Sequence, residues 1–162
     1  MADEQTATPA PTDSILARLR EWDTAAGTNS NLFRGELTVT ISPADLLRVC
    51  DFLRTGSALL FDFLSDITVV DRFPIEPRFE LNYHLLSLSL RQRLRLKTQL
   101  SGQQPVLDSV IPVWPTANWH EREAFDLFGI RFEGHPDLTR ILLPEDWEGY
   151  PLRKDYPTEG YR

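Results

Sequence analysis

Residues 79–97, with the sequence FELNYHLLSLSLRQRLRLK, carry the pattern from which we predict the fold. Apolar and polar residues alternate along most of this stretch, which is the period of a strand with one buried face. We predict a long strand from Phe79 to about Leu90, a turn near Arg91, and a second strand over 93–97. The apolar residues change face in the middle of the long strand, so we expect a β-bulge there or a segment covered on both faces.

Basic residues line one face of the second strand. Arg93, Arg95 and Lys97 alternate with leucines, so the three side chains point the same way. Two interpretations are open. The row is a docking surface for something acidic, or it is an ordinary solvated sheet face whose cations pair with neighbouring carboxylates.

The residues before this stretch predict further strands and two helices. We expect a helix starting at Thr12 or Asp13, a loop over 27–31, a strand over 36–41, a helix over 43–55, and two strands or one broken strand over 58–71. Ser42 should cap the second helix, and Gly56 should end it in a left-handed conformation. Apolar residues recur at helical spacing in both helices, at Ile15, Leu16, Leu19 and Trp22 and at Leu46, Val49, Cys50 and Leu53.

The rest of the chain divides at about Phe132. Residues 105–115 are punctuated by proline, and a helix over 117–128 follows, capped by Thr116 and ended by Gly129. Residues 133–162 contain four prolines and no sustained period, so they cannot form a long helix or a central strand. They are nevertheless too rich in aromatic and aliphatic side chains for a free tail, and we expect them to lie along another surface.

These elements predict an α+β fold, a two-layer α/β sandwich in which a small mixed β-sheet packs with helices. We expect a disordered lead-in over residues 1–12, an α/β domain over 13–132, and an extended, irregular C-terminal docking arm over 133–162. In the free chain the docking arm should be mobile, gaining its order from partner subunits.

Composition excludes several classes of function. The formal net charge of −7 argues against nucleic acid as a partner, because binding through counterion release needs a basic face. The longest uninterrupted apolar run has four residues, over 58–61, whereas a spanning helix needs about 20. The single cysteine, Cys50, lies on a predicted buried stripe and cannot supply the ligand set of a zinc ribbon or an iron–sulfur cluster. The acidic N-terminal residues show no targeting pattern.

The predicted helix over 117–128 is the only acid-dense helix. A zinc-protease helix needs a second histidine four residues after His120, and position 124 is alanine. Arg122 and Asp126 are spaced for an ion pair one helical turn apart. No phosphate-binding or nucleophile motif occurs, so we assign no catalytic, cofactor-binding or metal residue. A different-class alternative, a metal-dependent hydrolase, would use His120, Glu121, Glu123 and His135.

One run in the C-terminal third resembles a known family. Residues 119–130, WHEREAFDLFGI, are followed by Phe132, by GHP at 134–136, by RIL at 140–142 and by PLRKDY at 151–156. This pattern resembles the 30-kDa subunit of respiratory complex I, which is the C subunit of bacterial NADH:quinone oxidoreductase in its stand-alone form. Residues 83–88 and 93–97 also look like the long strand of that family and the strand after it.

The resemblance implies a non-catalytic structural or assembly subunit of the peripheral arm of complex I. Electrons would pass from NADH through FMN and iron–sulfur centres on other subunits to quinone, with no cofactor on this chain. The implied partners are the 49-kDa-type subunit and neighbouring iron–sulfur subunits, at the cytoplasmic face of the bacterial inner membrane and with only indirect membrane contact. A related membrane-bound hydrogenase or plastoquinone-reducing complex is an alternative.

The resemblance also points to interface residues. The acids of the ERExxD helix would pack at the junction with the 49-kDa-type subunit, and we interpret them as structural. The motif residues carried over are Glu121, Arg122, Glu123, Asp126, Gly129, His135, Pro136, Arg140, Pro151, Leu152, Arg153, Lys154 and Asp155.

Overall fold

The computed structural model describes residues 11–23 and 29–159. Most of the expected lead-in, residues 1–10, lies outside the described residues. The other two residues of that range already belong to the first helix, α1 (Pro11–Trp22). The expected loop over 27–31 is wrong in its described part, because residue 29 begins a strand.

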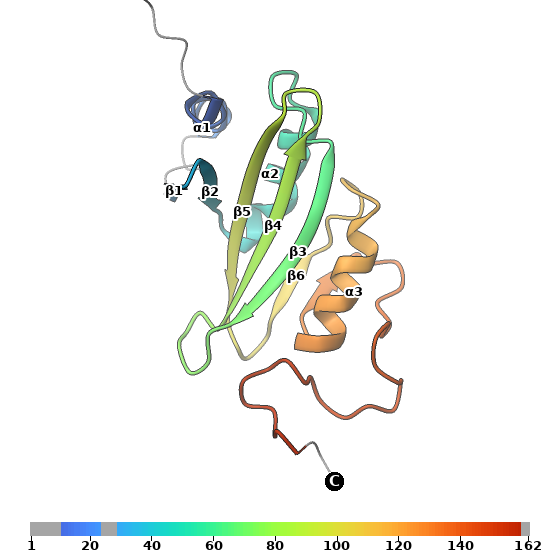
Figure 1. The fold of residues 1–162 in the computed structure, drawn as a ribbon. Helices are drawn as coiled ribbons and strands as arrows, with labels where there is room; N and C mark the ends of the chain where they lie inside the picture. Colours follow the sequence, from blue (N-terminus) through green and yellow to red (C-terminus); the bar gives the residue numbers. More distant parts are fainter. Residues whose placement is uncertain (1–10, 24–28, 160–162) are drawn as a thin grey trace, which may run out of the picture.

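A five-stranded mixed sheet forms the centre of the molecule (Figure 1). Its strands are β1 (Asn29–Phe33), β2 (Glu36–Thr40), β3 (Phe63–Asp71), β4 (Phe79–Ser87) and β5 (Gln92–Leu100). The order across the sheet is β1-β2-β5-β4-β3. The pairing of β2 with β5 is parallel and the other pairings are antiparallel, which confirms the predicted α+β class with a mixed sheet.

Alternation along the strands builds the core. One face of β4 and β5 contributes Phe79, Leu81, Tyr83, Leu85, Leu94, Leu96 and Leu100, all buried. The helix α2 (Leu46–Thr55), which a short 3-10 turn (Pro43–Asp45) precedes, contributes the predicted stripe of Leu46, Val49, Cys50 and Leu53. Ile15 and Leu19 of α1 join the same hydrophobic cluster. The sequence pattern thus identified both layers of the core.

The second part of the chain packs on the β3 side of the sheet. The helix α3 (Ala117–Phe128) lies against β3 (Figure 1). Two short strands pair with each other in parallel, β6 (Val106–Asp108) and β7 (Arg131–Glu133). Along the chain, β6 precedes α3 and β7 follows it. Gly129 ends α3 with φ 71°, which confirms the predicted left-handed position.

The long strand ends earlier than the pattern indicated. One face of β4 is buried from Phe79 to Ser87, so the expected change of face does not occur, although Asn82 on the other face is buried as well. Leu88 and Leu90 lie in the following turn and are exposed, and the Leu90 N–H donates to the Ser87 hydroxyl over 3.4 Å. The irregularity lies instead in β3, between Leu64 and Asp66, within one continuous strand.

The expected helix caps also need correction. Gly56 has φ −59°, and the left-handed residue after α2 is Leu60, with φ 46°. Neither Ser42 nor Thr116 makes a side-chain capping bond. Thr116 itself has right-handed helical dihedrals, whereas a residue that caps through its side chain needs an extended backbone.

Residues 134–159 form the C-terminal arm as the structure shows it, since Glu133 still belongs to β7. Within the described chain this arm contains turns and bends but no helix or strand, as its prolines predict. It passes α3 and then runs below the ends of the long strands (Figure 1). No helix of the described residues is both long and apolar enough to cross a membrane.

Candidate interaction site at the C-terminal arm

Glu121 lies on the buried side of α3 and has no exposed surface. Its carboxyl accepts hydrogen bonds from the Ser109 hydroxyl and from the Val110 N–H, both over 2.7 Å. Burial raises the pKa of Glu121 to about 7, because these two hydrogen bonds only partly offset the loss of water. The side chain therefore joins α3 to the segment after β6 and is not available to a partner.

Asp126, five residues further along α3, anchors the start of the C-terminal arm. Its Oδ2 accepts three consecutive backbone N–H groups, those of Ile141, Leu142 and Leu143, over 3.0, 2.7 and 3.0 Å. Its Oδ1 accepts from Arg140 Nη1 over 2.6 Å. Burial opposes ionisation, but the backbone N–H groups and Arg140 outweigh it and lower the pKa of Asp126. The carboxylate is thus ionised and fully engaged.

Arg140 folds the next part of the arm back on itself. Its guanidinium also donates to the carbonyl oxygens of Trp147 and Gly149, both over 3.1 Å. The same group lies 5.5 Å from the centre of the Tyr150 ring, which meets Phe125 of α3 edge-on. A single, mostly buried arginine side chain therefore holds residues 140–150 in one loop.

Arg122 does not pair with Asp126, so the predicted ion pair one turn apart is wrong. Its guanidinium donates instead to the Thr139 carbonyl and hydroxyl, over 3.1 and 2.9 Å, and to the Arg140 carbonyl over 3.2 Å. The physical reason is competition. The bonds from the arm already saturate the Asp126 carboxylate, and Arg122 reaches the arm backbone directly.

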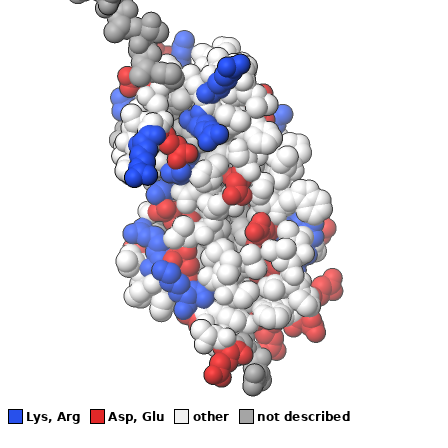
Figure 2. Space-filling model, viewed as in Figure 1, with Lys and Arg blue, Asp and Glu red and all other residues white. Residues whose placement is uncertain are grey.

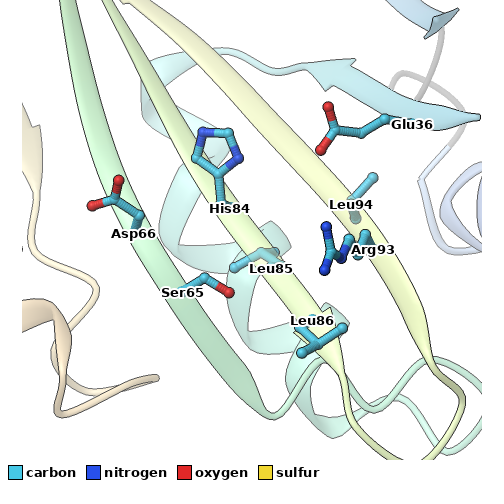
Figure 3. Close-up of a pocket in the computed structure, with 8 residues that line it drawn as sticks. All are labelled: Glu36, Ser65, Asp66, His84, Leu85, Leu86, Arg93 and Leu94. Carbon is cyan, nitrogen blue, oxygen red and sulfur yellow. The ribbon is translucent and has the colours of Figure 1, made fainter. Parts of the chain in front are cut away.

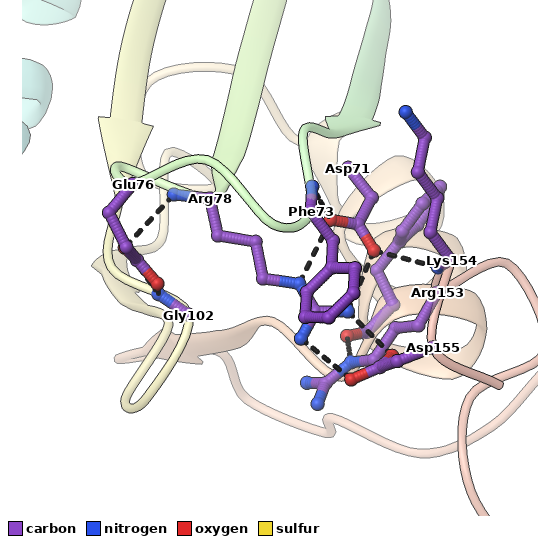
Figure 4. A network of polar contacts seen from close by, with 9 residues as sticks. Asp71, Phe73, Glu76, Arg78, Gly102, Arg153, Lys154 and Asp155 are labelled. Atoms are coloured by element: carbon purple, nitrogen blue, oxygen red, sulfur yellow. Dashed lines mark hydrogen bonds and ion pairs between the residues drawn. The ribbon is translucent and has the colours of Figure 1, made fainter.

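A second anchor holds the far end of the arm (Figure 4). Arg78, at the start of β4, forms a two-pronged ion pair with Asp71 at the end of β3, over 2.9 and 2.8 Å. The same guanidinium forms a second such pair with Asp155 of the arm, over 2.9 and 2.6 Å. The Lys154 N–H donates to Asp71 over 2.8 Å. One buried arginine thus joins the sheet to the arm.

The electrostatics of this anchor favour the charged state of all three groups. For Asp71, burial opposes ionisation, but the bonds from Arg78, Lys154 and Phe73 prevail and lower the pKa to about 2. Hydrogen bonds from Asp71 and Asp155 raise the pKa of Arg78. The network is therefore ionised across the neutral pH range.

Arg153 ties the arm to the end of α3. Its Nε donates to the Phe128 carbonyl over 2.6 Å, which satisfies a carbonyl that the helix end leaves free. Its guanidinium stacks over the rings of Phe79 and Tyr150 at 5.2 and 4.6 Å. The resemblance carried Arg153, Lys154 and Asp155 over as interface residues. In the structure Asp155 pairs with Arg78 and Arg153 caps its own helix, so these two side chains are engaged within the chain.

Gly129, the residue after α3, lies against the stacked side chains of Tyr150 and Arg153. A β-carbon added there would come within 2.4 Å of Tyr150 Cε2 and 2.7 Å of Arg153 Nη2. The position therefore needs glycine twice, for its positive φ and for the close approach of the arm.

The remaining motif residues lie around the two anchors. His135 faces the Asn118 carbonyl at 3.3 Å, and its Nδ1 accepts the Asp137 N–H over 3.0 Å. Pro136, Leu152 and Lys154 are exposed, Pro151 is half-buried, and the Leu152 N–H donates to the Leu127 carbonyl over 3.2 Å.

The residues of the hydrolase alternative are not brought together. His120 Nδ1 lies 3.4 Å from Asp66 of β3, Glu121 is in the core, and Glu123 is exposed to solvent. Within the described part of the chain, no three His, Cys, Asp or Glu residues form a group that could hold a metal. The structure therefore gives this alternative no support.

An open groove lies on the face of the sheet to which His84 points, opposite the face that carries the buried Tyr83 and Leu85 (Figure 3). It has a volume of about 310 Å³, and its polar lining includes Glu36, Asp66, His84 and Arg93. Beside it, Arg95 forms an ion pair with Glu36, and Lys97 pairs with Glu80 over 2.9 Å. The second interpretation of the basic row is therefore confirmed for Arg95 and Lys97. Burial first, and then the charge of Arg95, lowers the pKa of His84.

Asp71, Arg78 and Tyr150 were not predicted as site residues. Each lies at an element end or in the irregular arm, and each has at least one partner that is remote in sequence. The only hint in the sequence was Arg78, a charged residue between Pro77 and the predicted start of the strand at Phe79.

Comparison with known proteins gives one consistent family. The model of the family described as "Respiratory-chain NADH dehydrogenase, 30 Kd subunit" matches residues 39–162. The "C 2" subunit of NADH-quinone oxidoreductase from Rhizobium meliloti (strain 1021) is 51% identical over 134 residues, covering 83% of this chain and 73% of the relative. The C subunit of NADH-quinone oxidoreductase from Geobacter metallireducens is 43% identical over 152 residues, covering 93% of each chain.

Solved structures agree in fold. A structure described as "Nqo5 of the trypsin-resistant fragment (1-134) in P63 form" is 30% identical with a TM-score of 0.66, covering 78% of this chain and 98% of that chain. A chain of the membrane-bound sulfane sulfur reductase, an archaeal respiratory membrane complex, is 25% identical with a TM-score of 0.77, covering 90% and 85%. The family match spans β4, α3 and the whole anchored arm, and the chain therefore belongs to the 30-kDa subunit family of respiratory-chain NADH dehydrogenase.

Proposed function

We propose that the chain is a non-catalytic structural subunit of the peripheral arm of a bacterial, proton-translocating NADH:quinone oxidoreductase. The observation that carries this proposal is the family match over residues 39–162, together with relatives at 43 to 51% identity that are named as the C subunit of that enzyme. The match includes the C-terminal arm as well as the domain, so both parts belong to the function.

The chemistry of the side chains supports a role without catalysis. The single cysteine, Cys50, is buried in α2, and burial raises the pKa of its thiol, so it does not fit a cluster ligand. The motif acids Glu121 and Asp126 are buried and occupied by bonds within the chain. Electron transfer from NADH to quinone would run through FMN and iron–sulfur centres on other subunits.

The C-terminal arm would dock on the 49-kDa-type subunit and on neighbouring iron–sulfur subunits. The protein would lie at the cytoplasmic face of the bacterial inner membrane and reach the membrane only through the complex. Its net charge of −7 supports this placement, because anionic lipid head groups repel an acidic surface.

A second candidate is the equivalent subunit of a related membrane complex with another electron donor or acceptor. The likeness to a chain of the archaeal sulfane sulfur reductase complex supports it, with a TM-score of 0.77. The names of the relatives at 43 to 51% identity favour NADH and quinone.

Purification from the native cells tests the proposal. An affinity tag on the full chain should recover a complex that oxidises NADH and contains flavin and iron–sulfur centres, and deletion of the gene should remove NADH:quinone activity from membranes. The chain alone should show neither flavin absorbance nor NADH oxidation. A recovered complex that does not oxidise NADH would favour the second candidate, and a chain recovered alone would refute both.

A further inference from the structure

The C-terminal arm presents apolar side chains to solvent. Leu142, Trp147 and Leu152 are 60%, 40% and 51% exposed. Single exposed apolar residues are common, but three within a short irregular segment form a surface that gains free energy when a partner covers it.

The same segment is acidic. Residues 141–152, ILLPEDWEGYPL, contain three acids and no Lys, Arg or His. The acids Glu145, Asp146 and Glu148 are exposed, and none forms an ion pair with another described residue. Figure 2 shows acidic side chains gathered at the lower end and lower right of the molecule, where the C-terminal arm runs, while most basic side chains lie in the upper part and along the left edge.

The backbone of this segment is held before any partner arrives. The Asp126 and Arg140 bonds hold its start, and the Trp147 N–H donates to the Pro144 carbonyl over 3.1 Å. The Tyr156 hydroxyl donates to the Glu148 carbonyl over 3.3 Å. A loop with a prearranged backbone loses less conformational entropy on binding, so its side chains act as ready anchors.

We propose that residues 141–152 are an acidic and aromatic docking loop that inserts Trp147 into an apolar pocket rimmed by Lys and Arg residues on another subunit of the same complex. Tryptophan is the side chain that most often carries binding energy when it enters a pocket, and the three acids match a basic rim. The proposal rests on the proposed function, since it assumes that the chain has partner subunits.

Other occupants fit less well. Anionic lipid would be repelled by Glu145, Asp146 and Glu148. Two copies of the chain would each carry a net charge of −7 and would repel each other.

The test measures how much of the remaining complex co-purifies with tagged full-length variants in native cells that lack the untagged chain. Trp147→Ala should reduce the recovery of partner subunits at least about tenfold in a salt wash, and the triple variant Glu145→Lys, Asp146→Lys, Glu148→Lys should do the same. Two matched controls, Phe33→Ala for an exposed aromatic side chain and Asp51→Lys for an exposed acid on α2, should leave recovery unchanged.

The outcomes separate the two proposals. All variants should melt like the wild type, because the altered side chains are exposed and their backbone bonds remain. Full recovery of partners with both loop variants would overturn the docking loop while leaving the proposed function intact. Failure of the wild-type chain to recover any partner would refute the proposed function itself. A third outcome would refute only the basic rim. In that outcome Trp147→Ala reduces the recovery of partner subunits equally at all salt concentrations, and the triple variant recovers them like the wild type.

Discussion

Asp126 and Glu121 lie five residues apart on α3 and are both fully buried, yet their surroundings move their pKa values in opposite directions. Asp126 has an arginine and three backbone N–H groups around it, whereas Glu121 has one hydroxyl and one N–H. At the residue scale, donor number therefore decides which acid anchors the C-terminal arm as an anion and which fills the core near its titration point.

The first prediction concerns pH. The pKa of Glu121 rises from an ordinary 4.5 to about 7 on folding, so its contribution to the free energy of unfolding is complete below about pH 4.5 and is lost as the pH rises through about 7. Glu121→Gln should therefore melt above the wild type at pH 8 and close to it at pH 5. Thermal unfolding followed by circular dichroism at both pH values checks this. Glu123→Gln, on the exposed face of α3, is the control and should show no such difference.

The second prediction concerns the anchor at Asp126. Asp126→Asn should lower the free energy of unfolding by about 3 kcal/mol, because Arg140 keeps its charge in a mostly buried site without a carboxylate. Denaturant unfolding measures the change, with the exposed Asp137→Asn as control. A loss no larger than that of the control would contradict the role of Asp126.

The third prediction separates the two demands on Gly129. Gly35 has φ 80° with nothing within 4 Å of an added β-carbon, whereas at Gly129 the C-terminal arm blocks the same position. Gly35→Ala should cost about 1 kcal/mol for the left-handed backbone alone, and Gly129→Ala should cost clearly more. If both variants lose the same free energy of unfolding in denaturant, the arm must move away from an added β-carbon without destabilising the fold.

At the scale of elements, the C-terminal arm is attached mainly by polar bonds. No described residue after Phe132 is buried, so the arm should open at a lower free energy than the strands and helices. That the arm is mobile in the free chain stays a prediction, but the Asp126 and Arg78 anchors already hold it at two points within the chain. Order from partner subunits would add to these anchors.

The fourth prediction follows from that attachment. Trypsin should cut the isolated chain first within residues 140–162, at Arg140, Arg153 or Lys154, and the assembled complex should protect the same bonds. Asp126→Asn should speed cleavage after Arg140, because it releases that side chain. Mass spectrometry of timed digests identifies the order of cuts, and early cleavage within β3 to β5 would contradict the prediction. The related Nqo5 structure is described as a trypsin-resistant fragment, which agrees with such a division in that relative.

At the scale of the whole molecule, the sheet, α1, α2 and α3 share one continuous core, and the C-terminal arm adds only the partly buried Leu138 to it. The fifth prediction is that truncation after Pro144 leaves a folded domain that does not enter the complex. Arg78 would keep its ion pair with Asp71, which holds the end of β3 to the start of β4. Circular dichroism should show a cooperative melt, and membranes should lose NADH:quinone activity. Normal activity with the truncated chain would contradict this.

Features that depend on neighbours along the chain could be predicted from the amino-acid sequence. The alternation in β2 and β5, the apolar stripe of α2, and the helix stop at Gly129 follow from strand and helix periods and from backbone sterics, which act within about ten residues. The motif run over 119–156 also sufficed to identify the family, because so many residue types recur at fixed spacing. The strand β1 escaped detection because both its faces are largely exposed, which leaves no apolar period.

Which charges meet depends on the folded chain instead. Arg78 and Asp155 are 77 residues apart, and Asp71 and Lys154 are 83 apart, so no local period records either pair. The same reason explains the wrong pairing of Arg122 with Asp126. Helical spacing brings those two side chains within reach, but a buried carboxylate binds the donors that satisfy it most completely, and those come from the folded arm.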